Sequence, residues 1–249
     1  MATNRPARIE DQAYLLHAVA HRETSLVVDL LTREHGRIAA VAKGARRKGS
    51  ALRAVLMQFQ PLSVGFMGRN ELRVLTGAEW QGGQLAPQGD ALLLGFYMNE
   101  LMVRLLPRED PYPRLFDGYR NALDALAERG GPGRQGELAP ARRDDVLRRF
   151  EWLLLRETGY APDLKRDAAN RPIVAGQPYH WRAAGGFVPA VSGADDIVDG
   201  QTLIELSAGH FDSTQSRLQA KYLTRAILSH HLEGIPLNTR QILRDLHKL

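Results

Sequence analysis

The first 80 residues alternate between apolar and polar positions in short runs, which is the pattern of half-buried β-strands. Turn-forming residues such as Gly36, Gly68 and Asn70 separate the runs. A five-stranded antiparallel unit of this size is typical of a small barrel. We expect an OB-fold over residues 1–80, and an SH3-like barrel fits the same alternation nearly as well. The predicted strands lie in the stretches AYLLHAVAH, SLVVDLLTR, RIAAVAKG, PLSVGFMG and ELRVLTGAEW.

After the predicted strands, the spacing of apolar residues changes from two to about 3.6, which predicts helices. Residues 90–106 are apolar on all sides and predict a buried helix, which Asp90 can cap. Residues 114–130 and 144–160 carry narrower apolar stripes, and a glycine near the end of each stops the helix. We therefore assign residues 81–159 to the first part of a helical domain.

A turn-rich segment interrupts this helical pattern over residues 160–200. It contains only two short β-like pieces, so we expect a small irregular insert there. Two further helical stretches follow at residues 212–234 and 238–249, and Asn238 is a suitable N-cap for the second. The C-terminal part of the helical domain is expected over residues 201–249. The predicted fold class is α+β, with an OB barrel followed by a helical domain that carries a small insert.

Composition excludes several classes of protein. The chain has 249 residues, of which 44% are hydrophobic, so it can bury a sizeable core. It holds no run of about 18 apolar residues, and its first residues lack the apolar core of a secretory signal. It has no cysteine, which excludes disulfides, cysteine-ligated zinc, iron–sulfur clusters and a cysteine nucleophile. We expect a cytoplasmic protein with no membrane contact.

The net charge of +5 lies entirely in the first third of the chain. Residues 1–80 hold 12 Lys and Arg against 7 Asp and Glu, whereas residues 81–249 hold 21 of each kind. No acidic residue occurs between Glu34 and Glu71. Because like charges repel one another, such clustering is unfavourable unless a polyanion balances it.

The densest positive charge lies in residues 43–53, which we call the basic loop. Short basic runs are often only solvated surface. Here, however, the charge excess of the whole chain is concentrated on a candidate OB barrel, and such barrels bind single strands in a positive groove with aromatic platforms. We therefore expect a flexible loop that binds nucleic acid through Lys43, Arg46, Arg47, Lys48 and Arg53.

Few other residues carry recognisable chemistry. Phe59 and Phe66 flank the fourth predicted strand, where they either stack on bases or fill the core. Trp80, at the end of the fifth strand, is expected to pack between the two domains. No phosphate-loop, dinucleotide-binding, HExxH or GxSxG motif occurs. The absence of these motifs disfavours an enzyme that uses histidines such as His230 or the aspartates at 144–145. These aspartates stand at the start of a predicted helix, where they suit the helix dipole better than a catalytic role.

Several groups of residues stand in an order that marks a family. In the barrel region these are Glu23-Thr24-Ser25-Leu26, Gly36-Arg37 and Lys43-Gly44-Ala45-Arg46. The helical region adds the stretches YMNELMVRLL, VLRRFEWLLLRETGYAP and SRLQAKYLTRAILSHHLEGIPLNTRQIL. Together they resemble the bacterial RecO family of DNA repair proteins over about residues 10–246. No single motif is unique to that family, but their order and spacing support the resemblance.

The resemblance implies a recombination mediator that breaks no bonds and uses no nucleotide. Members of the family bind single- and double-stranded DNA and anneal complementary strands. They act with RecR, contact the acidic C-terminal tail of single-stranded DNA-binding protein, and help to load RecA. We expect the same partners for this chain. An RNA-binding OB protein without catalytic activity is the alternative.

The resemblance also bears on metal binding. Many members carry four cysteines as a zinc module after a Gly-Tyr pair. This chain has Gly159-Tyr160, but Asp167 and Asn170 lie near the positions of the first cysteine pair. We therefore expect neither zinc nor any other cofactor.

The expected site residues fall into two groups. The cations of the basic loop would contact phosphates without reading sequence, and Arg37 and Arg73 would extend their track. An acidic tail that ends in an aromatic residue and a carboxylate needs a basic residue beside an apolar pocket. Arg148 is the candidate for that role, and a solvated helix arginine is the alternative interpretation. The other expected members of this tail site are Arg149, Leu147, Tyr97 and Leu101.

Overall fold

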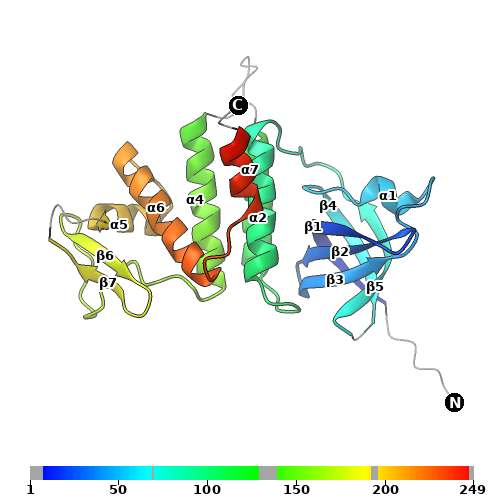
Figure 1. Cartoon of the computed structure of the whole chain (residues 1–249), viewed down its shortest axis with the longest axis horizontal. Helices are drawn as coiled ribbons and strands as arrows, with labels where there is room; N and C mark the ends of the chain where they lie inside the picture. The colour runs from blue at the N-terminus through cyan, green and yellow to red at the C-terminus, as the bar shows by residue number, and fades with distance from the viewer. Residues whose placement is uncertain (1–7, 69, 129–138, 192–195, 247–249) are drawn as a thin grey trace. The chain divides into compact units, whose positions relative to one another are not determined.

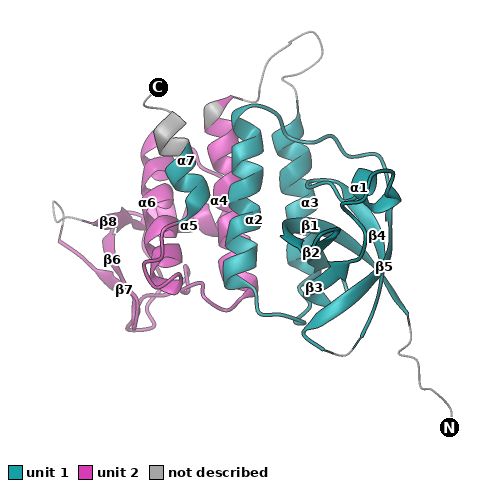
Figure 2. Cartoon of the chain, turned by 45° about the vertical axis from the view of Figure 1, so that its right-hand side comes forward, with its two compact units in different colours: residues 1–128, 237–249 teal, residues 129–236 magenta. Residues whose placement is uncertain are grey.

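The computed structural model describes residues 8–68, 70–128, 139–191 and 196–246. The chain divides into two compact units, which Figure 2 colours separately. Unit 1 comprises Met1–Glu128 together with Leu237–Leu249, and unit 2 comprises Arg129–Pro236. The C-terminal segment thus clusters with the N-terminal half of the chain. Among the described residues, no helix has the length and apolar character needed to cross a bilayer.

Unit 1 begins with a closed five-stranded barrel in the strand order β1-β2-β3-β5-β4, which confirms the predicted OB-fold (Figure 1). The pair β3–β5 is parallel, whereas every other pair in the ring is antiparallel. An odd number of strands cannot alternate in direction all the way around a ring, so closure requires one parallel pair. The strands are β1 (Ile9–His21), β2 (Ser25–Thr32), β3 (Gly36–Ala42), β4 (Pro61–Met67) and β5 (Leu72–Trp80).

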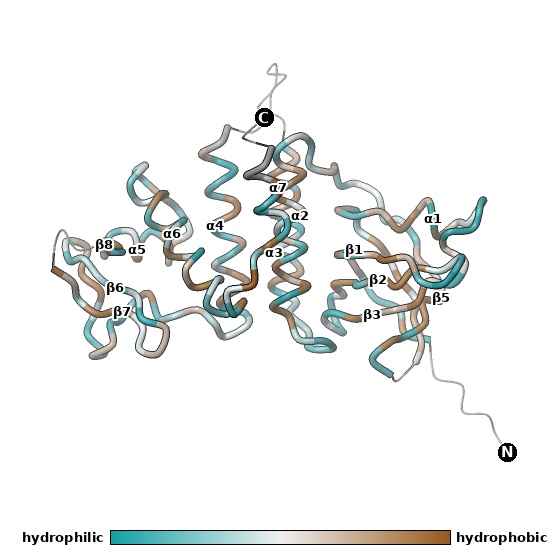
Figure 3. The backbone as a smooth tube through the Cα atoms, in the orientation of Figure 1, coloured by the Kyte–Doolittle hydropathy of each residue, from teal (hydrophilic) through white to brown (hydrophobic). Residues whose placement is uncertain are grey.

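The barrel encloses its own apolar core, as the alternating sequence pattern requires. Brown hydrophobic segments recur along the strands in Figure 3, and the chain turns teal in the segment that leads into α1 (Ala51–Val55). Residues from all five strands contribute to the core. Among those at most 2% exposed are Leu15, Val28, Ile38, Val64 and Phe66.

The β2–β3 hairpin lies closely against a later segment of unit 1. Gly36 has a φ of +68°, and a Cβ atom there would lie 2.0 Å from the carbonyl oxygen of Asp110. Only glycine permits both this backbone conformation and this approach. The amide of Glu109 donates to the carbonyl of Arg37 over 3.0 Å, which fixes the hairpin to the segment after α2 (Asp90–Leu105).

Three further helices complete unit 1 with the barrel. α2 packs against β1 and α3 (Pro113–Ala127), and Tyr119 on α3 donates to Asn99 on α2 over 2.5 Å. α7 (Asn238–Leu246) packs on α2, where the Glu100 carboxylate accepts hydrogen bonds from both Asn238 and Thr239. Burial opposes ionisation of Glu100, but these hydrogen bonds outweigh it and lower the pKa of the carboxyl group.

Unit 2 contains the remaining helices and a small antiparallel sheet in the order β7-β6-β8. α4 packs against α6 and α5, and β8 joins the sheet to these helices. The long helices follow the predicted periodicity, and Ser213 caps α6 by accepting from the amide of Ser216. The elements are α4 (Pro140–Glu157), β6 (Pro178–Arg182), β7 (Gly186–Pro189), β8 (Ile197–Asp199), α5 (Gly200–Ala208) and α6 (Thr214–His231).

Candidate nucleic-acid interface

The basic loop follows β3 directly and is built from consecutive turns. The backbone amides of Ala45, Arg47, Ser50 and Arg53 each donate to the carbonyl three residues earlier, and the short α1 continues this path. The side chain of Ala45 is buried in the barrel core, which anchors the loop. The sequence indicated a flexible loop, but the structure gives it a defined conformation that holds its side chains outward.

Arg46 ties the loop to the turn between β1 and β2. Its backbone amide donates to the carbonyl of Thr24 over 2.9 Å. One guanidinium nitrogen lies 3.4 Å from the carbonyl oxygen of Arg22 and 3.3 Å from that of Glu23. These are long contacts on an exposed side chain, so most of the guanidinium remains open to solvent. The tie positions the loop while leaving the charge accessible.

All five cations of the basic loop are exposed. Within the described ranges, no carboxylate lies within ion-pair distance of any of them. Their positive charge is therefore balanced only by solvent ions, which a polyanion displaces on binding. The structure keeps these side chains together on one ordered segment: Lys43, Arg46, Arg47, Lys48 and Arg53.

Arg37 and Arg73, expected to extend this track, are instead partnered within unit 1. Arg37 donates to Asp29 over 3.0 Å and to the carbonyl of Leu106, and its side chain is 11% exposed. Burial lowers the pKa of Arg37, and Asp29 opposes that effect. Arg73 donates to Glu109 over 2.8 Å and lies above the ring of Phe66. Because carboxylates neutralise both, we assign these arginines to the fold rather than to the track.

The aromatic residues of the barrel differ in exposure. Phe59 and Phe66 are 2% and 0% exposed, so both fill the core and neither can stack on a base. Phe59 lies edge-on to Phe96 at 5.0 Å between ring centroids. Trp80 was expected to be covered between domains, but 55% of it is exposed. The sequence pattern did not distinguish these rings, because all three lie near strand ends.

The expected tail site does not form around Arg148, because that side chain is 2% exposed in unit 2. It donates to Glu151 over 2.7 Å and to Thr224 over 3.0 Å, and Thr224 donates to Glu151 in turn. Leu147 is also buried, whereas Arg149 is exposed. An arginine that is enclosed and paired in this way supports the packing of α4 on α6.

The other two expected tail-site residues, Tyr97 and Leu101, belong to unit 1 and are 3% and 0% exposed. Both lie on the buried side of α2. Arg149 is therefore the one member of the expected tail site that is open to solvent. The difference in burial between Arg148 and Arg149 had a signal in the sequence. Arg148 lies seven residues, or about two helical turns, before the buried Leu155 and therefore shares its face of α4.

The residues considered for catalysis have structural partners. Asp144 and Asp145 at the start of α4 pair with Lys221 and Arg217 on α6. His230 lies edge-on to the rings of Trp181 and His231. These contacts join elements of unit 2 and leave none of the residues in a nucleophile–base arrangement with one another.

Each unit has a pocket among its described residues. One, of about 270 Å³ in unit 1, is lined by glutamines and includes Tyr14, whose burial raises its pKa to about 12. Tyr14 donates to Gln84, which donates to Asp124, so a chain of hydrogen bonds lines the pocket. The other, of about 420 Å³ in unit 2, lies beside Tyr160 stacked on His231.

The insert in unit 2 is organised by a carboxylate. Asp167 accepts from the amides of Ala169 and Arg171, each over 2.9 Å, and from the Arg171 side chain. The amide of Ala168 donates to Phe187 on β7, which ties this turn to the small sheet. No cluster of three or more metal-ligating side chains occurs in the described part of the chain. The turn is held by hydrogen bonds to Asp167, and the residues present there do not fit a cysteine-ligated zinc ion.

Comparison with known families accounts for nearly the whole sequence. The family model described as "Recombination protein O N terminal" matches residues 7–83, which cover the barrel. The model described as "Recombination protein O C terminal" matches residues 86–241. The two matches follow one another along the chain with only residues 84–85 between them.

Individual relatives extend over the same length, and each is named DNA repair protein RecO. The relative from Burkholderia pseudomallei is 49% identical over 96% of this chain and 84% of its own. The relative from Aromatoleum aromaticum is 44% identical over 97% of this chain and 98% of its own length. That from Polynucleobacter asymbioticus is 40% identical over the full length of both. With both family models matched and such relatives aligned over most of their length, the chain belongs to the RecO family of DNA repair proteins.

Proposed function

We propose that this protein is a non-catalytic recombination mediator that binds DNA through the basic loop of its OB barrel. The observation that carries the proposal is the set of five exposed cations on one ordered loop, none of which has a carboxylate partner among the residues that the structure describes. Membership of a DNA repair family favours DNA as the polyanion. Contacts to phosphates are independent of sequence, which suits a protein that acts wherever DNA is damaged.

The same loop supports strand annealing. Two complementary strands repel each other through their phosphates, and a surface of exposed cations screens this repulsion when both strands are held together. Both single- and double-stranded DNA are therefore ligands in this proposal, because the loop contacts the backbone that they share. No nucleotide is consumed, since annealing is favourable once repulsion is screened.

The proposed partners follow from the family. They are RecR, the acidic C-terminal tail of single-stranded DNA-binding protein, and indirectly RecA. With Arg148 enclosed, Arg149 is the exposed cation among the expected tail-site residues, and a cation of this kind suits an acidic tail. Arg149→Glu should abolish capture of a tail peptide on a biosensor while leaving DNA binding intact. Unchanged capture would remove α4 from this role.

The decisive experiment measures the anisotropy of labelled oligo-dT across a salt series. The variant Lys43/Arg46/Arg47/Lys48→Ala removes four of the five loop cations. If about five phosphates are contacted, the slope of log K against log salt for wild type is roughly −3 to −4, and the variant's slope approaches about −0.7. Equal affinities and slopes for both proteins would exclude the loop as the DNA site.

A matched control removes the same charge elsewhere. The exposed cations Arg114, Arg156, Lys165 and Arg182 are distributed over both units, and their joint replacement by alanine also lowers the net charge by four. We expect this control to bind oligo-dT nearly as wild type does. A loss equal to that of the loop variant would show that only net charge matters. Tighter binding to RNA of the same sequence would favour the RNA-binding alternative.

A further inference from the structure

Trp80 is a hydrophobic side chain that unit 1 leaves largely uncovered. It ends β5, and 55% of it is exposed. Among the phenylalanines, tyrosines and tryptophans in the described part of unit 1, Trp80 is the only one that is exposed. Exposing an indole is unfavourable, because its large apolar surface stays in water. A ligand with a flat apolar face would cover this surface.

The indole is held in place along its edge. Its Nε1 donates to the side-chain oxygen of Gln60 over 2.9 Å. At Gly82, a Cβ atom would lie 3.9 Å from Cη2 of the ring, so the backbone there lies close to the six-membered ring of the indole. The hydrogen bond and the nearby backbone restrict the orientation of the ring. Such a ring is preorganised for stacking, because little side-chain entropy is lost when a second ring lies on it.

The sheet topology places Trp80 at the same end of the barrel as the basic loop. β3 and β5 pair in parallel, with Ala39 opposite Leu72 and Val41 opposite Val74. Parallel neighbours end at the same end of a sheet, so the loop that follows β3 and the residue that ends β5 share that end. The β-ladder thus relates two features that are almost thirty positions apart in sequence.

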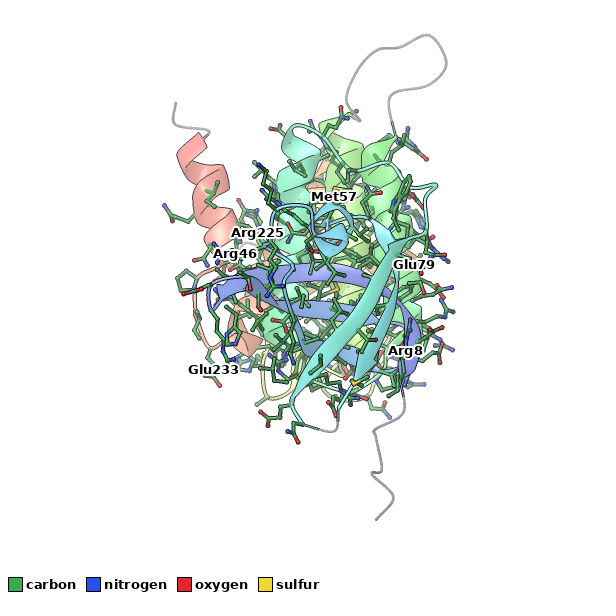
Figure 4. All side chains as sticks on the ribbon, turned by 90° about the vertical axis from the view of Figure 1, so that its right-hand side faces the viewer. Arg8, Arg46, Met57, Glu79, Arg225 and Glu233 are labelled. Carbon is green, nitrogen blue, oxygen red and sulfur yellow. The ribbon has the colours of Figure 1, made fainter. Side chains whose placement is uncertain are left out.

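The segment between these features connects them physically. The basic loop leads into α1, which packs against β5, and the chain then reaches Gln60, the partner of Trp80. In the view of Figure 4, Arg46 and Glu79 lie on opposite sides of α1, with Met57 between them. Met57 is 50% exposed, so the surface around α1 has apolar as well as positive character.

We propose that Trp80 is a stacking platform for a nucleobase of a single strand whose phosphates lie on the basic loop. The inference rests on the DNA binding proposed above and adds a contact to the base itself. Base–aromatic stacking tolerates any sequence, because every base has a flat face. A duplex offers no such face along its length, because its bases already stack on one another. Trp80 should therefore favour single strands over duplexes.

Three ligands separate stacking from phosphate binding. They are an oligo-dT, an abasic strand of the same length, which keeps the phosphates but lacks bases, and a duplex. Trp80→Ala should weaken oligo-dT binding about tenfold and leave binding of the abasic strand and the internal part of a long duplex unchanged. Trp80→Phe should retain most of the affinity for oligo-dT, because phenylalanine preserves a stacking face.

Fluorescence gives a second readout on the wild-type protein. The chain has three tryptophans, and a base stacked on one of them quenches its emission. Oligo-dT should quench wild type, whereas the abasic strand should not, and Trp80→Phe should lose this quenching. This test does not depend on an alanine variant that folds, and thermal unfolding of each variant checks that its fold is retained.

The outcomes distinguish the two proposals. If wild type binds none of the three ligands, the proposed DNA-binding function fails. If the loop variant weakens binding to all three but Trp80→Ala changes none, the phosphate contacts stand and the stacking platform is excluded. Equal weakening of all three ligands by a folded Trp80→Ala protein also excludes stacking, because the abasic strand has no base to lose.

Discussion

The basic loop of unit 1 and the Arg148 cluster of unit 2 use the same residue type in opposite ways. The loop cations are exposed and have no carboxylate partner in the described chain, whereas Arg148 is enclosed with Glu151 and Thr224. The first arrangement leaves charge available to a ligand. The second uses charge to join two helices, and removing one partner would leave the other charge buried and unpaired, which costs free energy. Composition counts these arginines alike, so the partner of each side chain decides its role.

Other arginines lie between these extremes. Arg73 is largely covered, but its partner Glu109 is 43% exposed. Arg171 is 63% exposed, but its partner Asp167 is 2% exposed. In such mixed pairs, the buried partner sets the structural cost of breaking the pair, and the exposed partner determines what a ligand can reach.

The difference between exposed and enclosed charges leads to four tests, which follow from the largest expected effect to the smallest.

The largest effect is expected at Glu151. Glu151→Leu removes the carboxylate and leaves the Arg148 charge enclosed without its main partner, which should lower the free energy of unfolding by about 3–5 kcal/mol. Urea unfolding measures this loss. Arg149→Ala is the matched control on the same helix, and its effect should stay within about 0.5 kcal/mol because Arg149 is exposed. An equally stable Glu151→Leu protein would mean that Arg148 is accessible and available to a partner.

The pair of Asp167 and Arg171 should respond to pH. Burial raises the pKa of Asp167, but hydrogen bonds from Arg171 and Ala169 outweigh burial and lower it from its ordinary value. A carboxyl group with a lowered folded-state pKa stabilises the fold above its unfolded pKa and loses that contribution as the pH falls through the folded value. Hydrogen exchange at the Ala169 and Arg171 amides should therefore lose protection below about pH 4.

The variant Asp167→Asn isolates this effect. It keeps one acceptor oxygen but removes the charge, so these amides should be less protected at neutral pH and the acid dependence should disappear. Retained protection in the variant, with the same acid dependence as wild type, would assign the effect to another group.

A smaller effect is expected when Arg73 loses its carboxylate partner. Glu109→Asn removes the carboxylate that pairs with Arg73, and asparagine suits the positive φ of 61° at this position. Arg73 should then act as an additional phosphate contact. Affinity for oligo-dT should rise roughly two- to threefold, and the salt slope should steepen by about 0.7. No change in slope would mean that burial, rather than its partner, keeps Arg73 from DNA.

The smallest effect is expected on the stability of the loop variant. The cations of Lys43/Arg46/Arg47/Lys48→Ala have no ion pairs to lose, so the free energy of unfolding should change by at most about 0.5 kcal/mol. At low salt the variant should be slightly more stable, because repulsion within the loop is relieved. Thermal unfolding at low and high salt measures both points. A large loss of stability would show that the loop supports the barrel.

The sequence predicted those parts of the fold that local periodicity controls. Alternation located the five barrel strands, and helical spacing located the long helices. It did not reveal that β3 and β5 are parallel neighbours, because strand pairing between distant segments leaves no local pattern. The hydrogen bonds between α7 and Glu100 could not be predicted either, since their partners are separated by 138 and 139 positions in the sequence.

The candidate site was predictable in part for a related reason. The exposure of the basic loop was predictable because its cations follow one another without regularly spaced apolar residues. Such a charged run is stable only in contact with solvent. Trp80 could not be placed from sequence, because the burial of a residue at a strand end depends on what packs beyond it. The charge of Arg148 is typical of a surface residue. Its position on the same helix face as the buried Leu155 indicated that the side chain would be buried.

The bond between Glu100 and the start of α7 also bears on how the protein is made. The ribosome synthesises all of unit 2 between these two partners, which are 138 positions apart. Until residues 237–246 emerge, α2 lacks the helix that packs on it, and unit 1 cannot reach its final form. A contact of this separation forms late and slowly. Completion of the unit that bears the proposed DNA site is thereby linked to synthesis of the unit inserted into it.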